Sequence, residues 1–243
     1  LVAIKILPSR FSANTDYIKR FQQEGKAAAK LNHPNIVAAV DVGAVGRRHY
    51  FVMEYVDGTD VHELLKKESK LSERRALEII QEIALALQHA HGKGFLHRDI
   101  KPGNILLGPE AVPKIGDFGL ARPVGEGHNP DEIVWGTPGY SAPEVVNNPG
   151  EVDQRVDVFA VGVLLYELLT AKVPSEPWQP PSAVSQCSPE FDRIIRRATH
   201  PSPELRYAKA EDLAKELDEL GDKLKKPVLR RAKTAAPAVA GRS

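Results

Sequence analysis

The chain has 243 residues, of which 42% are apolar and 27% are charged, and its formal net charge is +1. This composition can bury a core and excludes disorder over most of the length, while the near balance of charge excludes polyanion binding by the whole chain. The single cysteine, Cys187, excludes an intrachain disulfide and favours a reducing compartment. No apolar run approaches the roughly 18 residues that a membrane span needs.

The first 57 residues have the patterns of a mixed strand and helix region. Residues 2–7 alternate as a strand, with Lys5 as the one charge in it. Residues 15–31 have helical periodicity, and Glu24 falls on the apolar stripe of that helix. Pro34 disfavours helical geometry in the residue before it, so the helix should end nearby. Two further strands are expected at residues 36–42 and 49–55.

The chain then becomes mostly helical. Ser72 can cap a helix that ends at Gly92 and Gly94, because serine favours the N-cap position and glycine the C-terminal end. The remaining expected elements are short strands at 95–96, 105–107 and 114–115 and helices at 157–169, 189–199 and 208–225. The sequence therefore predicts an α+β fold, with a small strand-rich lobe followed by a larger helical lobe.

Both ends of the chain have unusual features. The last 21 residues contain seven basic and no acidic residues, which leaves 26 basic and 32 acidic residues in 1–222, a net charge of −6. This alanine- and proline-rich end indicates a disordered, solvated tail, or a segment that binds a membrane surface or an acidic partner. The chain opens inside an apolar strand without an initiator methionine, so we expect that other residues precede Leu1.

Four blocks in a fixed order carry the chemistry. They are Val2-Ala3-Ile4-Lys5, His97-Arg98-Asp99-Ile100-Lys101-Pro102-Gly103-Asn104, Asp117-Phe118-Gly119 and Ala142-Pro143-Glu144. Together they resemble the protein kinase family, from residue 1 to about residue 221. The resemblance implies a bilobal fold, with a partial N-lobe and hinge at 1–57, a C-lobe at 58–221 and a tail at 222–243.

Phosphoryl transfer mainly requires that a charged nucleotide is positioned and its developing charge offset. Lys5, on a strand, can supply a point charge for phosphate oxygens. Glu24 is its natural partner, because a carboxylate on an apolar helix face is costly without one. By resemblance, Asp117 and Asn104 would bind Mg²⁺, whose preferred ligands are oxygens.

The resemblance also assigns roles in the catalytic loop. Asp99 would accept or orient the substrate hydroxyl proton, a step typically worth about 10²–10⁴ in rate. Lys101 would face the transferred phosphate, and its place two residues after Asp99 resembles serine/threonine kinases more than tyrosine kinases. The substrate loop would include Gly136 and Thr137, with Thr137 bonding toward Asp99 and Lys101.

Further residues would bind the nucleotide or support the fold. The segment Met53-Glu54-Tyr55-Val56 resembles the hinge of the family. Met53 would be the gatekeeper, and the backbones of Glu54 and Val56 would meet adenine. Ala3 and Asp60 complete the expected nucleotide site, and Asp60 matches a position that contacts ribose or a basic substrate residue. The expected structural residues are the spine members His97 and Phe118, the buried anchor Asp157 of the catalytic-loop backbone, and the ion pair of Glu144 with Arg206.

Three departures from the family pattern stand out. The glycine-rich phosphate loop, expected before Lys5, is absent, which indicates an N-terminal fragment or a protein without that lid. Residues 119–135 lack a phosphorylatable hydroxyl, so Asp131 or Glu132 is a candidate stand-in for phosphate beside Arg98 and Arg122, unless both are simply solvated. Four prolines between residues 170 and 188 predict that a helix usual in the family is missing.

The leading hypothesis is a cytoplasmic serine/threonine protein kinase that uses ATP and Mg²⁺ on protein substrates. The wording of its motifs resembles bacterial members of the family, some of which continue into a linker and a membrane span, although the chain itself contains no span. The rival hypothesis is a pseudokinase-like nucleotide-binding module or scaffold. A nucleic-acid binder is a distant third, because the basic tail has no aromatic residues for stacking.

Overall fold

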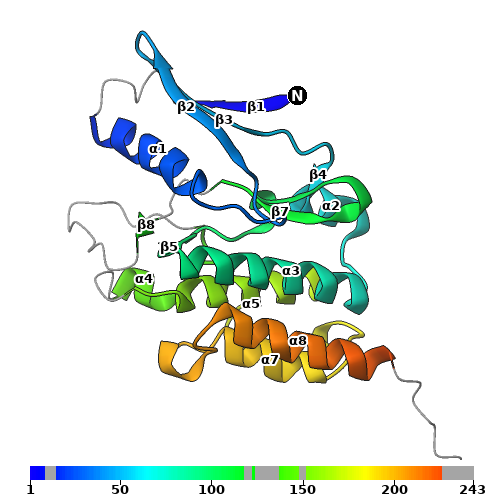
Figure 1. The fold of residues 1–243 in the computed structure, drawn as a ribbon. Coiled ribbons are helices and arrows are strands. Elements are labelled where there is room, and N and C mark those ends of the chain that lie inside the picture. Colours follow the sequence, from blue (N-terminus) through cyan, green and yellow to red (C-terminus); the bar gives the residue numbers. More distant parts are fainter. Residues whose placement is uncertain (9–14, 118–121, 124–136, 148–151, 226–243) are drawn as a thin grey trace, which may run out of the picture.

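A computed structural model of the chain describes residues 1–8, 15–117, 122–123, 137–147 and 152–225. The side chains of residues 16, 17, 20, 23, 24, 26, 27, 122 and 123 lie outside this description. A small sheet with one helix beside it lies above a larger group of helices, which confirms the predicted α+β fold (Figure 1).

The upper part is an antiparallel sheet of strand order β1-β3-β2, formed by β1 (Val2–Ile6), β2 (Ala39–Val45) and β3 (Arg48–Glu54). Gly46 lies in the two-residue turn between β2 and β3 with a φ of +60°, a backbone conformation that glycine adopts without strain. Helix α1 (Thr15–Ala28) packs on this sheet. The small core that joins them contains Leu7, Phe21, Ala28 and Phe51.

The predicted strand at 36–42 is displaced in the structure, because β2 begins at Ala39. Ile36 and Val37 are buried, and their backbone follows β7 (Pro113–Ile115) instead of β3. Ile36 forms a parallel bridge with Ile115, and the Val37 N–H donates to the Ile115 carbonyl at 2.9 Å. An apolar run therefore indicated burial correctly and the strand position only approximately.

The lower part contains the main helices. These are α2 (Val61–Glu68), α3 (Glu73–Gly92), α4 (Pro143–Asn147), α5 (Arg155–Thr170), α6 (Pro181–Val184), α7 (Glu190–Ala198) and α8 (Ala210–Lys225). Helix α5 is apolar on all sides and is buried by α3, α7 and α8, as expected for the central helix of a core. The Ser72 hydroxyl caps α3 by accepting the Arg75 N–H, as the sequence predicted.

Short strands connect the two parts. Strands β4 (Thr59–Asp60), β6 (Ile105–Leu107) and β7 form a sheet of order β4-β6-β7, and β5 (Phe95–Leu96) pairs with β8 (Arg122–Pro123). Single turns of 3₁₀-helix cover Pro102–Asn104, Pro109–Ala111 and Pro203–Leu205. Among the described helices, none is long and apolar enough to cross a membrane.

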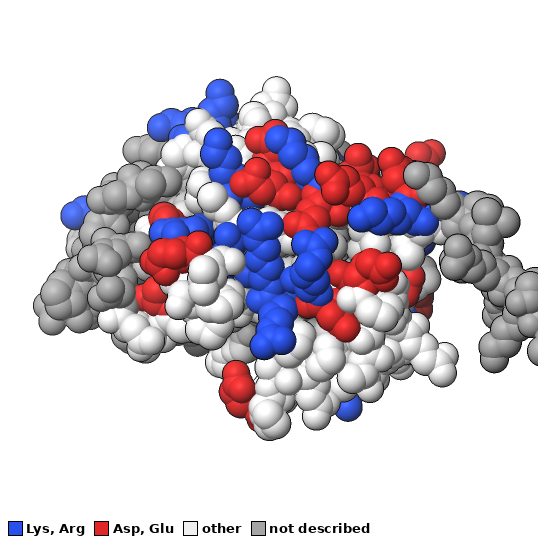
Figure 2. All heavy atoms as spheres, turned by 90° about the horizontal axis from the view of Figure 1, so that it is seen from below, with Lys and Arg blue, Asp and Glu red and all other residues white. Residues whose placement is uncertain are grey.

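The underside of the molecule carries neighbouring groups of basic and acidic side chains. Figure 2 shows Lys and Arg side chains gathered in the middle of this face, with Asp and Glu side chains beside them. Helix α7 carries exposed Arg193, Arg196 and Arg197, and α8 is rich in acidic residues. Glu216 of α8 pairs with both Arg193 and Arg197, so these charges help to join the two helices.

Candidate active site

Asp99 is the centre of a polar cluster in the loop between β5 and β6. Its Oδ2 accepts from Lys101 Nζ at 2.7 Å and from Asn104 Nδ2 at 3.0 Å. Its Oδ1 accepts from Thr137 Oγ1 at 2.8 Å, and Lys101 Nζ lies 3.0 Å from the same hydroxyl. The structure therefore brings together four residues that the sequence singled out, although Thr137 is 38 residues from Asp99.

Asp157 holds the backbone of this loop from below. It is completely buried at the start of α5, and its carboxylate accepts the His97 N–H at 2.9 Å and the Arg98 N–H at 2.7 Å. Burial by itself would raise the pKa of Asp157, but the hydrogen bonds that its carboxylate accepts from His91 and from the Arg98 N–H help to hold the pKa below its ordinary value. The carboxylate thus stays ionised beneath the loop.

His97 links the loop to the end of β7. Its Nδ1 lies 3.2 Å from the Asp99 N–H, which donates to it, and its Nε2 lies 3.1 Å from the Gly116 carbonyl. These contacts select the tautomer protonated at Nε2, which donates to Gly116. Arg98, between the two residues, has a φ of +67°, an uncommon conformation for a non-glycine residue that the surrounding bonds hold in place.

Lys5 and Asp117 face one another across the site. Lys5 Nζ lies 2.5 Å from Asp117 Oδ1, and Asp117, two residues after the end of β7, has a φ of +56°. The expected partner Glu24 lies in α1, but its side chain lies outside the described part of the structure, as does Phe118. The expected pairing of Lys5 with Glu24 thus stays a prediction.

Asp117 and Asn104 have the chemistry that Mg²⁺ requires. Asn104 uses its amide nitrogen for both of its bonds to Asp99, which turns its amide oxygen away from that residue. A carboxylate and an amide oxygen are hard donors that suit this ion. The two residues therefore fit the expected metal role by their donor type.

The segment expected to form the hinge begins within β3, because Met53 and Glu54 are the last two residues of that strand and Tyr55 and Val56 follow it. Ala3 of β1 is in register with Met53 of β3, so these two expected nucleotide contacts lie on neighbouring strands. Gly58 permits a close approach between the chain after the hinge and β6, because a Cβ there would lie 1.8 Å from the Leu107 carbonyl oxygen. Asp60 caps α2, with its Oδ1 accepting the Glu63 N–H at 2.8 Å, a structural role in addition to the expected nucleotide contact.

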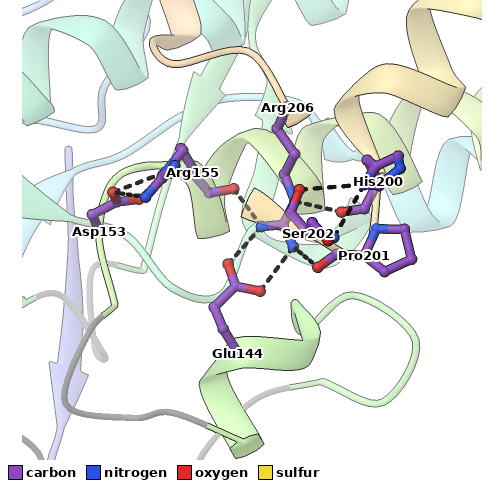
Figure 3. A network of polar contacts seen from close by, with 7 residues as sticks. All are labelled: Glu144, Asp153, Arg155, His200, Pro201, Ser202 and Arg206. Carbon is purple, nitrogen blue, oxygen red and sulfur yellow. Dashed lines mark hydrogen bonds and ion pairs between the residues drawn. The ribbon is translucent and has the colours of Figure 1, made fainter. Parts of the chain in front are cut away.

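A buried ion pair supports the loop after Thr137. Arg206 donates to both carboxylate oxygens of Glu144, at 2.5 and 2.8 Å, and Figure 3 shows the two side chains pointing toward one another. Arg206 also donates to the carbonyls of Arg155, His200 and Pro201, so its whole guanidinium is bonded. The ion pair expected between Glu144 and Arg206 is thus present.

The segment between α5 and α7 and the segment before Thr137 were the subjects of the remaining predictions. Between residues 171 and 189, all described, the structure contains a single-turn helix, α6, in agreement with the expectation of a missing longer helix. Gly136 and the proposed phosphate stand-ins Asp131 and Glu132 lie outside the described residues.

Several contacts among the described residues of this region were not predicted, and three of them lie outside the Lys5–Asp117 pair and the bonds of His97. His91 Nε2 lies 2.7 Å from Asp157, Lys114 pairs with Glu54, and the Tyr140 hydroxyl donates to Glu167. The signal for the first was weak: His91 is on the buried side of the last turn of α3, where a polar residue needs a partner.

The sequence profile described as "Protein kinase domain" matches residues 1–235. The chain belongs to the protein kinase family. This protein kinase chain is 32% identical over 245 residues to serine/threonine-protein kinase PknL of Mycobacterium tuberculosis, covering 94% of the chain and 61% of the relative. It is 35% identical over 244 residues to serine/threonine-protein kinase pkn3 of Myxococcus xanthus, covering 89% and 44%.

A third relative is serine/threonine-protein kinase PknB of Mycolicibacterium smegmatis, which is 34% identical over 239 residues, covering 89% of the chain and 38% of the relative. The kinase chain therefore spans between about two fifths and three fifths of the length of these relatives. All three are bacterial, as the wording of the motifs indicated.

Proposed function

We propose that this domain is a serine/threonine protein kinase that transfers the γ-phosphate of ATP to a hydroxyl group of a protein. The observation that carries the proposal is the cluster of Asp99, Lys101, Asn104 and Thr137 on one side and the Lys5–Asp117 pair on the other. The printed names of the bacterial relatives support the same assignment.

Each residue has a role that its position supports. Asp99 orients the substrate hydroxyl and receives its proton, and Lys101, already beside Asp99, offsets negative charge on the transferred phosphoryl group. Thr137 forms hydrogen bonds with both Asp99 and Lys101 and links them to the segment that contacts the substrate. Lys5 binds phosphate oxygens of the nucleotide.

Asp117 and Asn104 would hold Mg²⁺, which when bound would supply positive charge against the phosphate groups. At the opposite end of the nucleotide, the backbones of Glu54 and Val56 bind adenine, with Ala3 and Met53 beside it and Asp60 near the ribose. Protein substrates and a cytoplasmic location, where ATP is available and Cys187 stays reduced, belong to the same proposal.

We also propose the division of the chain that this function implies. Residues 1–57 form the N-lobe and hinge, and the C-lobe begins at residue 58. Helix α8 continues to Lys225, four residues past the boundary expected from the sequence, so we place the start of the basic tail after that helix.

Replacement of Asp99 by asparagine tests the proposal. The variant D99N keeps the size of the side chain and loses the proton acceptor, so we expect phosphate transfer to a serine- and threonine-containing peptide library to fall by about 10²-fold or more. Binding of MgATP, measured by calorimetry, should persist. The matched control is D222N, which removes an exposed carboxylate at the far end of α8.

The two hypotheses predict different results. A kinase shows Asp99-dependent transfer, with label on serine or threonine of the acceptor. A scaffold binds MgATP and shows equal background transfer in the wild-type protein, D99N and D222N, which would contradict the proposed function.

A further inference from the structure

An ion pair joins the hinge to the strand that leads to Asp117. Lys114 Nζ lies 2.9 Å from Glu54 Oε1 and 3.1 Å from Oε2, and the two side chains are 20% and 33% exposed. Glu54 is the last residue of β3, and Lys114 is the middle residue of β7. One contact therefore connects the segment expected to hold adenine with the segment expected to hold the phosphates and metal.

The Glu54 carboxylate also fixes a third segment. Its Oε2 accepts the Ala38 N–H at 3.2 Å, and the Glu54 backbone N–H donates to the Ala38 carbonyl at 2.9 Å. The residues just before Ala38 are bonded to β7, because Val37 N donates to Ile115 O and Ile115 N donates to Asn35 O. Residues 35–38 are thus held between the hinge and β7 by backbone bonds on both sides.

This arrangement limits how the hinge can move relative to Asp117. The Glu54 N–H is already used by Ala38, which leaves the Glu54 carbonyl as the group that can meet a base. Lys114 is three residues before Asp117 on a strand whose neighbours are fixed by β6 and by residues 35–37. A change in the Glu54–Lys114 contact would therefore change the spacing between the two ends of the nucleotide site.

We propose that Glu54 and Lys114 are positioning residues for the nucleotide. Their pair sets the distance between the adenine-binding hinge and Asp117, so that one ATP molecule fits both ends without distortion. The inference rests on the proposed kinase function and goes further, because it assigns a role to two side chains that need not touch the nucleotide.

The test uses single variants that break the pair without adding bulk. E54Q keeps an oxygen for the Ala38 N–H but loses the charge, and K114M keeps the length of the side chain but loses the ammonium group. We expect the KM for ATP and the Kd for MgATP to rise about 3- to 10-fold in each, with kcat within about 2-fold, since a uniform loss of binding raises KM alone.

Two further variants separate positioning from general stability. K114R keeps a cation that can pair with Glu54, so its Kd for MgATP should stay within about 2-fold of the wild-type value. In the double variant E54Q/K114M the Kd should equal that of either single variant, because each substitution already removes the same interaction. The matched control is the pair E68Q and R75M, which breaks a similar ion pair between α2 and α3 away from the hinge.

Several outcomes would overturn the inference. One is an unchanged Kd for MgATP in E54Q and K114M, and another is an additive effect on that Kd in the double variant. A third is a rise in kcat, which would mean that the pair restrains catalysis. A lowered melting temperature with an unchanged Kd would assign the pair to folding alone. Calorimetry measures nucleotide binding independently of phosphate transfer, so this test is separate from that of the proposed function. The proposed function is contradicted if D99N transfers phosphate at the same rate as the wild-type protein.

Discussion

Asp157 determines the shape of a loop that is about 60 residues away from it in the sequence. The carboxylate is fully buried and receives hydrogen bonds from two successive backbone N–H groups, at His97 and Arg98, and from the ring of His91. Arg98 has a positive φ, and the bond to Asp157 helps to hold it there. The position of Asp99, the next residue, depends on this arrangement.

The variant D157N tests that dependence. Asparagine has the same shape but presents an NH₂ group to one of the three donors, which leaves a buried donor unsatisfied. We expect the free energy of unfolding to fall by about 2–4 kcal/mol and phosphate transfer to fall at least about tenfold. Urea denaturation and a peptide assay measure the two effects. Loss of stability no larger than in D218N, which alters an exposed carboxylate of α8, would contradict the assignment.

At this scale the sequence predicted the residues better than their contacts. The pair of Glu144 and Arg206 and the link from Asp157 to the catalytic-loop backbone followed from motif positions. The contacts of Lys114 and His91 did not, because a lysine on a short strand or a histidine at a helix end has many possible partners. Only the fold shows which of them is within reach.

At the scale of elements, helices followed from sequence more reliably than strands. Helices α3, α5 and α8 have strong periodic or continuous apolar patterns, and a capping serine marks the start of α3. The strand β2 was displaced because residues 35–38 pair with another segment, and a short apolar run does not identify its partner. His33 lies two residues before this segment, and its ring lies 5.3 Å from that of His89 on α3.

Protonation of His33 should lower the free energy of unfolding at mildly acidic pH. Burial lowers the pKa of His33 below its ordinary value of 6.5, and the charges of His89 and Lys114 lower it further. The unfolded chain therefore takes up this proton at a higher pH than the folded chain. The stabilisation is complete above pH 6.5 and is lost as the pH falls through the lowered pKa of the folded state.

The measurement is the free energy of unfolding between pH 8 and pH 5 for the wild-type protein, H33Q and the control H62Q. His62 is exposed on α2, so H62Q should follow the wild-type curve. H33Q should lose less stability than the wild-type protein as the pH falls. Parallel curves for wild-type and H33Q would show that His33 does not contribute to the pH dependence.

At the scale of the whole molecule, Arg206 joins parts that are far apart in the sequence. It connects Glu144, 62 residues earlier and in the helix that follows Thr137, with the chain between α7 and α8. Its side chain is fully buried and that of Glu144 is 13% exposed, so solvent screens the pair little. The guanidinium also satisfies three carbonyl groups, as Figure 3 shows.

The two partners should therefore differ in their contribution to stability. R206M removes every donor of the guanidinium at once and leaves the mostly buried Glu144 carboxylate and three carbonyls without a hydrogen-bond donor from this side chain. We therefore expect the free energy of unfolding to fall by about 3–5 kcal/mol. E144Q leaves Arg206 with its three carbonyl acceptors and one amide oxygen, so we expect a loss of about 1–3 kcal/mol. In the double variant the loss should be smaller than the sum of the two, because no charge is left uncompensated. Urea denaturation of the wild-type protein, the two single variants and the double variant measures this cycle. Equal and additive losses of stability in the two single variants would contradict an energetic coupling between Arg206 and Glu144.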